Sequence, residues 1–181
     1  MKTKSTDRRI LRTRQRLTNS LRELIVEKGY EHITVQDVLK RANVGRSTFY
    51  SHFESIGHLL PCEDNFRLML APRNGHINFL ALYEHVAQNQ ALANALLSSS
   101  GGAIVMGHLK NVLVEFIREQ LQTPADEKEK DMLFLVSEAA AAALVTLLTE
   151  WYEQGLRFTP SAMSIKSREL LGKICGPLKR T

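Results

Sequence analysis

Apolar residues recur along most of the chain at the spacing of one face of an α-helix. Near the N-terminus, Leu17, Leu21 and Leu24 belong to one such stripe, and a longer stripe runs through residues 131–154. Steps of three and four residues are typical of an amphipathic helix, whereas a half-buried strand alternates apolar and polar residues. No stretch of this chain keeps that alternation for long. The pattern therefore predicts an all-α fold.

Local signals predict where the first two helices end and begin. Gly29 follows Lys28 at the end of the first apolar stripe, and glycine is the usual residue after a helix C-terminus. Thr34 precedes the next apolar run, and Asp37 lies three positions later. This spacing predicts a capping box at the start of the second helix. Residues 43–45, Asn-Val-Gly, predict the turn that ends it.

A short third helix is predicted from residue 46 to residue 53. Phe49 and Phe53 are four positions apart, so both can face the core, while the other positions are mainly polar. Two helices joined by a short glycine-containing turn form the helix-turn-helix pattern. In that motif the second helix enters the major groove of DNA with its N-terminal residues towards the bases.

The side chains of this third helix suit contacts with DNA. Arg46 can donate to both acceptors of a guanine, and the methyl group of Thr48 can pack on a thymine methyl. Tyr50 and His52 suit phosphate oxygens, which fix the position of a protein without specifying sequence. The alternative is that Tyr50 and His52 only complete the surface of the core.

The rest of the chain predicts a second, larger helical domain. A fourth helix is expected from a cap at Ser55 to Leu70, with a bend at Pro61, which lacks a backbone N–H. The segment 71–75, Ala-Pro-Arg-Asn-Gly, is the clearest linker. We therefore divide the chain into a helix-turn-helix domain, residues 1–60, and a regulatory and dimerisation domain, residues 61–181. The later helices are expected near 76–97, 101–121 and 131–154, with Thr123-Pro124 starting the long one and Thr159-Pro160 starting the last.

Positive charge is concentrated at the N-terminal end. The 181 residues carry a net charge of +5, and residues 1–60 hold twelve Lys or Arg against six Asp or Glu. The remaining residues hold twelve against thirteen. A one-sided basic field attracts polyanions, so Lys4, Arg8 and Arg9 are predicted to contact DNA. The alternative is a basic tail that is simply solvated.

Residues 28–55, KGYEHITVQDVLKRANVGRSTFYSHFES, resemble the DNA-binding signature of the tetracycline-repressor (TetR) family of bacterial regulators. The resemblance covers residues 9–60, and the later segment WYEQGLRFTPSAM resembles the join between the last two helices in one group of that family. A departure is Ile56, where the family commonly has a lysine that contacts phosphate. The DNA-facing positions that the resemblance implies are Thr34, Gln36, Arg46, Ser47, Thr48, Tyr50 and His52.

The resemblance also implies a homodimer formed by the last two helices and a small-ligand site in the C-terminal domain. The alanine run 139–143 would let a second helix approach closely, although alanine is also simply the best helix former. The interface positions expected are Val136, Ala140, Ala143, Leu144, Leu147, Leu170 and Ile174. Candidate pocket residues are Phe79, Tyr83, His108, Phe116 and Trp151, although ordinary core is the preferred interpretation because pockets and cores share composition.

No motif predicts an enzyme, a metal site or a cofactor. The six histidines share no metal-ligand spacing, and the chain has no glycine-rich phosphate loop, nucleophile elbow or paired carboxylate motif. Its two cysteines lie far apart, which fits a reducing compartment. The apolar run 139–148 is far shorter than the roughly 20 residues needed to span a bilayer. We therefore expect a cytoplasmic protein without a membrane segment.

Together these features predict a dimeric repressor that binds a near-palindromic double-stranded DNA operator and responds to a small-molecule effector. One alternative is an activator or co-activator whose C-terminal domain binds a protein partner. A different class is a helical small-molecule enzyme or carrier in which the N-terminal motif is incidental. The basic N-terminal region and the polar third helix argue against that last alternative.

Overall fold

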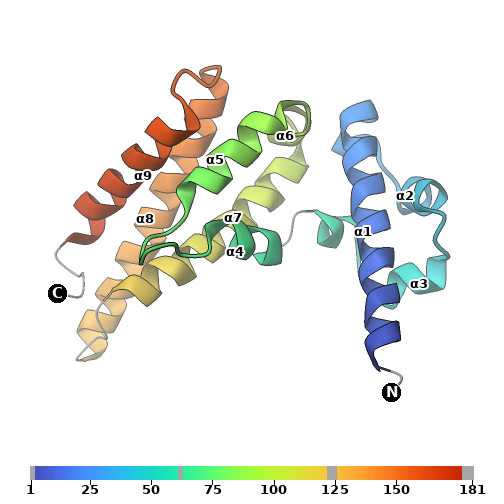
Figure 1. The fold of residues 1–181 in the computed structure, drawn as a ribbon, viewed down its shortest axis with the longest axis horizontal. Coiled ribbons are helices and arrows are strands. Elements are labelled where there is room, and N and C mark those ends of the chain that lie inside the picture. The colour runs from blue at the N-terminus through green and yellow to red at the C-terminus, as the bar shows by residue number, and fades with distance from the viewer. Residues whose placement is uncertain (1–2, 61–62, 122–125, 177–181) are drawn as a thin grey trace. The chain divides into compact units, whose positions relative to one another are not determined.

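The computed structural model describes residues 3–60, 63–121 and 126–176, and the segments that it describes are helical with short connections (Figure 1). The all-α prediction is confirmed: no β-strand occurs within those ranges, and Arg73 and His76 form only an isolated bridge. The helices are α1 (Thr3–Lys28), α2 (Val35–Ala42), α3 (Arg46–Tyr50), α4 (Glu63–Leu70), α5 (Phe79–Gln88), α6 (Gln90–Leu97), α7 (Ser100–Gln120), α8 (Glu127–Glu153) and α9 (Pro160–Cys175), with 3₁₀ turns at Tyr30–His32 and Ile56–Leu59.

The chain forms two compact units. The first comprises Met1–Cys62 and Gln90–Val105, so that α6 and the beginning of α7 pack with the N-terminal helices. The second comprises Glu63–Asn89 and Met106–Thr181. The domain division at residue 60 stays a prediction.

The predicted capping box at the start of α2 is confirmed. The backbone N–H of Asp37 donates to the Thr34 hydroxyl oxygen at 3.2 Å, and the backbone N–H of Thr34 donates to the Asp37 carboxylate at 2.8 Å. The Lys28 ammonium lies 2.9 Å from the same carboxylate. The box therefore satisfies two N–H groups at the helix start and ties α2 to the end of α1.

These contacts make the stability of the first unit depend on pH. The Lys28 ammonium, followed by the Thr34 hydroxyl and backbone N–H, holds the pKa of Asp37 well below its usual range. A lowered folded-state pKa stabilises the fold above the unfolded-state value of about 3.9, and this stabilisation is lost as pH falls further. We expect Asp37→Asn to unfold at a lower temperature than the wild type at pH 7, and the difference between the two melting temperatures to shrink steadily as pH falls below about 4. Thermal unfolding followed by circular dichroism between pH 7 and pH 2 tests this, with Asp131→Asn on the exposed surface of α8 as the control.

The predicted continuous helix from Ser55 to Leu70 is wrong. A 3₁₀ turn spans Ile56–Leu59, the Ser55 side chain makes no capping hydrogen bond, and α4 begins only at Glu63. Leu60 adopts φ −59° and ψ 157°, an extended conformation. The residue before a proline is disfavoured in the α region, because the proline ring clashes with it. Pro61 itself lies outside the described residues, but its effect on Leu60 accounts for the break.

The start of α7 packs closely on the first 3₁₀ turn, within the first unit. Both the backbone N–H and the hydroxyl of Ser100 donate to the Glu31 carboxylate, at 2.6 and 2.8 Å, and these bonds lower the pKa of Glu31. A Cβ atom at Gly101 would lie 2.8 Å from Cγ of Tyr30, and one at Gly102 would lie 2.5 Å from the Leu96 carbonyl oxygen. Two successive glycines therefore permit this approach.

The second unit is organised by α9, which packs against α5 and α8. The hydroxyl groups of Tyr83 and Ser167 are 2.8 Å apart in the core, and the Tyr83 ring meets Trp151 edge-to-face at 5.0 Å. The Trp151 indole N–H donates to the Phe158 carbonyl at 2.8 Å, which closes the connection between α8 and α9. Burial raises the pKa of Tyr83, so its hydroxyl stays protonated at neutral pH.

The caps of the last two helices are only partly as expected. Thr159 caps α9, with Pro160 in the first turn, and its hydroxyl accepts from the Ala162 N–H at 3.2 Å, which confirms that prediction. The start of α8 differs, because Asp126 is its N-cap and accepts from the Glu129 N–H at 2.8 Å. The expected starting pair Thr123-Pro124 lies outside the described residues.

Candidate nucleic-acid interface

The first three helices form a small core that fixes the position of α3. Leu17 and Leu21 of α1 are fully buried, as are Val38 of α2 and Phe49 of α3. Phe53, just beyond α3, is also buried and lies beside Phe49, with ring centroids 5.7 Å apart. Because the inner side of α3 is anchored by these two rings, its remaining side chains are held at the surface.

The turn between α2 and α3 depends on one left-handed residue. Asn43 has φ 50° and ψ 54°, a conformation that asparagine tolerates better than most residues. The Val44 N–H donates to the Leu39 carbonyl at 3.1 Å, as expected for a closed helix end. Gly45 supplies no side-chain cap for α3, as its sequence requires.

Arg16 supports this turn from α1, a role that sequence reasoning missed. Its guanidinium donates to the carbonyl of Ala42 and, at 3.2 Å, to the carbonyl of Asn43. Arg16 is one of the twelve Lys and Arg residues of the N-terminal 60, and no local signal shows that it contacts a turn 26 residues away. Arg16 thus stabilises the segment that orients α3.

The outer face of α3 is polar and exposed. Tyr50 is 50% exposed, whereas Phe49 beside it is 0% exposed. The Arg46 guanidinium lies 5.9 Å from the centre of the Tyr50 ring, a cation–π distance that restrains both side chains. Ser47, Thr48 and His52 are also exposed. The structure therefore gathers Arg46, Ser47, Thr48, Tyr50 and His52 on one short segment, and the exposure of Tyr50 and His52 disagrees with a purely core role.

The other predicted DNA contacts lie in two places. Thr34 and Gln36 are exposed at the start of α2, although the Thr34 hydroxyl also donates to Asp37 at 2.7 Å as part of the capping box. The side chains of Lys4, Arg8 and Arg9 lie outside the described residues, and their backbone belongs to α1.

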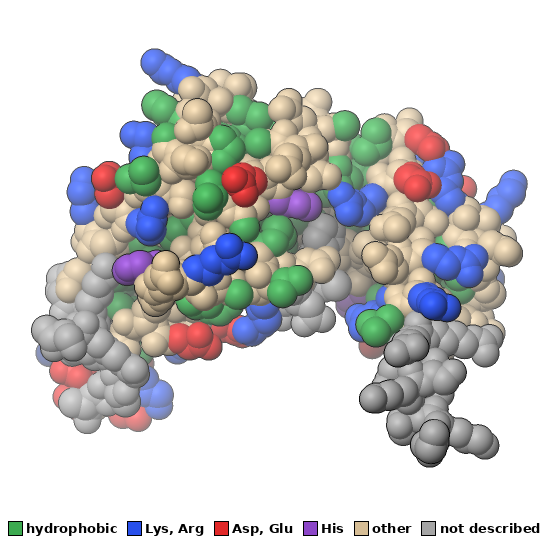
Figure 2. Space-filling view, in the orientation of Figure 1, with side chains coloured by type: hydrophobic (Ala, Val, Ile, Leu, Met, Phe, Trp, Pro, Cys, Tyr) green, Lys and Arg blue, Asp and Glu red, His purple; other side chains and the backbone are tan. Residues whose placement is uncertain are grey.

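The basic side chains of this unit divide into structural and solvent-facing groups. Arg41 forms a bidentate pair with Glu27, which lowers the pKa of that carboxylate, and Arg14 lies 5.4 Å from the centre of the Phe53 ring. Figure 2 shows several Lys and Arg side chains exposed over this unit. Exposed Lys and Arg side chains on the unit that carries an exposed polar helix suit the phosphate backbone of DNA.

Comparison with known proteins agrees with this geometry. Residues 17–61 match the family model described as bacterial regulatory proteins of the tetR family. Residues 74–173, more than half of the chain, match the model described as a transcriptional regulator C-terminal region. The chain belongs to the TetR family of transcriptional regulators. The fold and the family expected from the sequence are thereby confirmed.

Curated relatives of this TetR-family regulator match only part of the chain. The chain is 38% identical over 60 residues to the uncharacterized HTH-type transcriptional regulator YxbF of Bacillus subtilis. It is 42% identical over 48 residues to the transposon Tn10 TetC protein of Escherichia coli. The alignments cover 33% and 26% of this chain but only 16% and 24% of those proteins, so they compare a small part of each relative.

Solved structures match the TetR-family chain over nearly its full length. A TetR transcriptional regulator from Streptococcus agalactiae 2603V is 29% identical, with a TM-score of 0.57, over 97% of this chain and 98% of that one. The dihydroxyacetone kinase operon activator DhaS is 17% identical, with a TM-score of 0.60, over 93% and 98%, and at this identity the likeness concerns the fold.

Some of the predicted dimer residues are buried in the protomer, and the others are partly exposed. Ala140 is 0% exposed and Leu144 is also buried, because both face the interior of their own protomer. The place of these two residues in a dimer interface stays a prediction, and both are already enclosed by their own protomer. Five of the predicted residues keep partial exposure: Val136, Ala143, Leu147, Leu170 and Ile174.

The predicted pocket residues lie mainly in the core of the second unit. Phe79, Tyr83, Phe116 and Trp151 are buried, and His108 is partly buried. The contacts of Tyr83 with Trp151 and with Ser167 agree with the core interpretation. The cavity of the second unit is lined by other residues, which no local pattern in the sequence distinguishes.

Proposed function

We propose that this chain is a homodimeric repressor that recognises a near-palindromic DNA operator through α3. The observation that carries the proposal is the contrast across this helix: Phe49 is sealed in the core while Arg46, Thr48 and Tyr50 are exposed together. In a helix-turn-helix protein these exposed positions meet base edges and phosphates. Arg46 would recognise a guanine, and Tyr50 and His52 would hold phosphates.

Binding to the DNA that flanks its own gene tests this function. Fluorescence anisotropy with the flanking fragment and with a scrambled fragment of the same length should show tighter binding to the former. Transcription from that promoter in vitro should fall when the protein is added. Equal affinity for both fragments would contradict operator recognition, and a rise in transcription would identify an activator instead.

The basic residues at the start of α1 should add affinity without sequence preference. Replacing Lys4, Arg8 and Arg9 together with glutamine should weaken binding to both fragments. Each phosphate that the variant no longer neutralises should reduce the slope of log affinity against log salt by about 0.9. Anisotropy titrations between low and high salt measure this slope. An unchanged slope would show that the N-terminal segment is solvated rather than bound to DNA.

An exposed apolar face on α8 and α9 supports the proposal of a dimer. Leu135 of α8 is 59% exposed and Ile165 of α9 is 51% exposed. Ala139 and Ala142 are also exposed, at spacings of four and seven from Leu135, so these three share one side of α8. Only 28% of the most apolar stretch of α8 is buried inside the protomer. By length and composition α8 could cross a membrane, but a symmetric partner would cover this face equally well.

Ala142 and Ala140 provide a matched pair of variants for the dimer. Ala142→Arg should leave the protomer folded but produce monomers with much weaker operator binding, because it places a charge on the shared face. Ala140→Arg should instead unfold the second unit, since Ala140 is 0% exposed and an unpaired buried charge is strongly unfavourable. Analytical ultracentrifugation and circular dichroism separate the two outcomes. A monomeric wild-type protein would remove the dimer from the proposal.

The proposal also includes a small-molecule effector bound in the second unit and a cytoplasmic location. The effector would lower operator affinity by about 1–3 kcal/mol, which is typical of coupling between two sites.

A further inference from the structure

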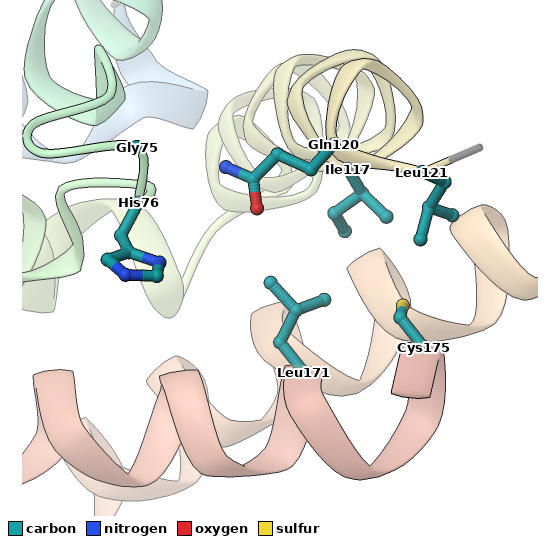
Figure 3. Close-up of a pocket in the computed structure, with 7 residues that line it drawn as sticks. All are labelled: Gly75, His76, Ile117, Gln120, Leu121, Leu171 and Cys175. Atoms are coloured by element: carbon teal, nitrogen blue, oxygen red, sulfur yellow. The ribbon is translucent and has the colours of Figure 1, made fainter. Parts of the chain in front are cut away.

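The second unit contains a cavity that differs from the aromatic cluster suggested by the sequence. Its volume is about 280 Å³, and it is lined by Gly75, His76, Ile117, Gln120, Leu121, Leu171 and Cys175. These residues come from the turn before α5, the C-terminal end of α7 and the C-terminal half of α9 (Figure 3). All of them belong to the second unit, so the cavity is a property of that unit alone.

Gln120 gives this cavity an unusual polar group. Its Nε2 atom is buried and has no hydrogen-bond partner in the part of the chain that the structure describes. Figure 3 shows the Gln120 side chain extending from α7 into the space between His76 and Leu171. Buried amide groups are almost always hydrogen-bonded, because losing hydration without a new partner is unfavourable. An unpaired donor that faces a cavity is therefore a natural contact for the acceptor of a ligand.

The remaining walls limit the chemistry of that ligand. Ile117, Leu121 and Leu171 are apolar and almost fully buried, and the Cys175 side chain is equally buried. Among the described residues that line the cavity there is no Lys, Arg, Asp or Glu, so a charged group would lose its hydration without gaining a counter-charge from them. His76 is exposed at the open side.

A tight turn fixes the wall that carries His76. Asn74 and Gly75 have φ 51° and 76°, and Arg73 and His76 exchange two backbone hydrogen bonds of 2.8 and 3.1 Å. Positive φ at both central residues defines a type I′ turn, for which Asn-Gly is the preferred sequence. The segment that the sequence predicted as a linker is therefore a defined wall, and the cavity does not depend on a loose loop.

We infer that this cavity binds a small neutral molecule with an apolar ring and a carbonyl oxygen that accepts a hydrogen bond from Gln120. A cavity of about 150 Å³ lined by apolar side chains accommodates benzene, so the larger volume here has room for a substituted ring. The cavity would be the effector site of the proposed regulator, and only that last step rests on the proposed function.

Acetophenone, ethylbenzene and benzoate form a suitable set of probes. The first has a neutral carbonyl oxygen, the second has nearly the same shape without an acceptor, and the third is charged. In ¹H–¹⁵N spectra of the whole protein, acetophenone should shift the side-chain NH₂ signals of Gln120, which are assigned by their loss in Gln120→Leu. Ethylbenzene should bind without moving these signals in the same way, and benzoate should bind more weakly than either.

The variant series separates the hydrogen bond from the shape of the cavity. Gln120→Leu should lower the affinity for acetophenone by about 2- to 10-fold. Its affinity for ethylbenzene should be unchanged or higher. Gln88→Leu, at the exposed end of α5, is the matched control and should change neither affinity. Equal affinities of all three probes, or no shift of the Gln120 signals in the wild type, would overturn the inference. If Gln120→Leu does not fold, the affinities of the three probes for the wild-type protein still test the inference.

Operator affinity measured with and without acetophenone separates this inference from the proposed function. Binding of acetophenone with unchanged operator affinity would retain the ligand site and remove its regulatory role. Operator binding without any acetophenone binding would retain the regulator and overturn the ligand site.

Discussion

Replacing Arg46 with alanine should weaken operator binding by about 1–3 kcal/mol for each half-site, and a dimer has two half-sites. The guanidinium is at the start of α3, is exposed, and lies 5.9 Å from the Tyr50 ring, which restrains it before DNA binds. A bidentate contact to guanine depends on the planar fork of arginine, so Arg46→Lys should recover only part of the affinity. Competition anisotropy with operators changed at single base pairs measures the reduction in affinity and its position.

Two further variants show whether the reduction belongs to base recognition. Tyr50→Phe keeps the ring that faces Arg46 but removes the hydroxyl, so it should lower the affinity for all DNA sequences by the same factor. Arg41→Ala should mainly reduce thermal stability, because Arg41 is paired with Glu27. If Arg46→Ala lowers the affinity for operator DNA and for scrambled DNA by the same factor, Arg46 contacts phosphate rather than a base.

Replacing Trp151 with alanine should lower the free energy of unfolding of the second unit by about 3–5 kcal/mol, the range for large aromatic residues in a core. Trp151 is 3% exposed, packs edge-to-face on Tyr83 and donates to the Phe158 carbonyl. The substitution therefore removes core packing and a buried hydrogen bond together. Urea unfolding followed by far-ultraviolet circular dichroism measures the change.

Trp151→Phe and Ser167→Ala divide this effect into its parts. Trp151→Phe keeps an aromatic ring but leaves the Phe158 carbonyl without its indole donor, so its cost should be smaller. Ser167→Ala leaves the buried Tyr83 hydroxyl without this partner and should cost about 1–3 kcal/mol. Because Trp151 is the single tryptophan, wild-type fluorescence reports on the second unit alone. A Trp151→Ala protein as stable as the wild type would contradict the role of Trp151 in this core.

Features that depend on neighbouring residues were predictable from the sequence. The Thr34–Asp37 capping box and the Thr159 cap involve residues three positions apart, and the structure confirms both. The break before α4 is also local, since Leu60 adopts the extended conformation that a following proline favours. Our prediction of a continuous helix there gave too much weight to the apolar pattern and too little to this restriction.

Features that depend on distant residues were not predictable. The contact of Arg16 with the turn before α3 joins positions 26 residues apart, and nothing in its neighbourhood distinguishes it from the other N-terminal arginines. Ala140 is buried inside its own protomer, and α9 packs against α8, yet nothing local in the sequence marks that side of α8 as the inward one. The cavity beside Gln120 likewise needs three separated segments to meet. Periodicity identifies the apolar face of a helix. It does not show whether that face packs within its own chain or against another chain.

The close packing of Tyr30 on Gly101 has a consequence for how relatives of this protein can diverge. A side chain at position 101 would collide with the aromatic ring at position 30, so position 101 cannot gain a side chain while Tyr30 is retained. Natural sequences with a larger residue at 101 should carry a smaller one at 30, and those that keep the tyrosine should keep the glycine. Such paired replacement would mark which members of the family join these two helical segments in the same way.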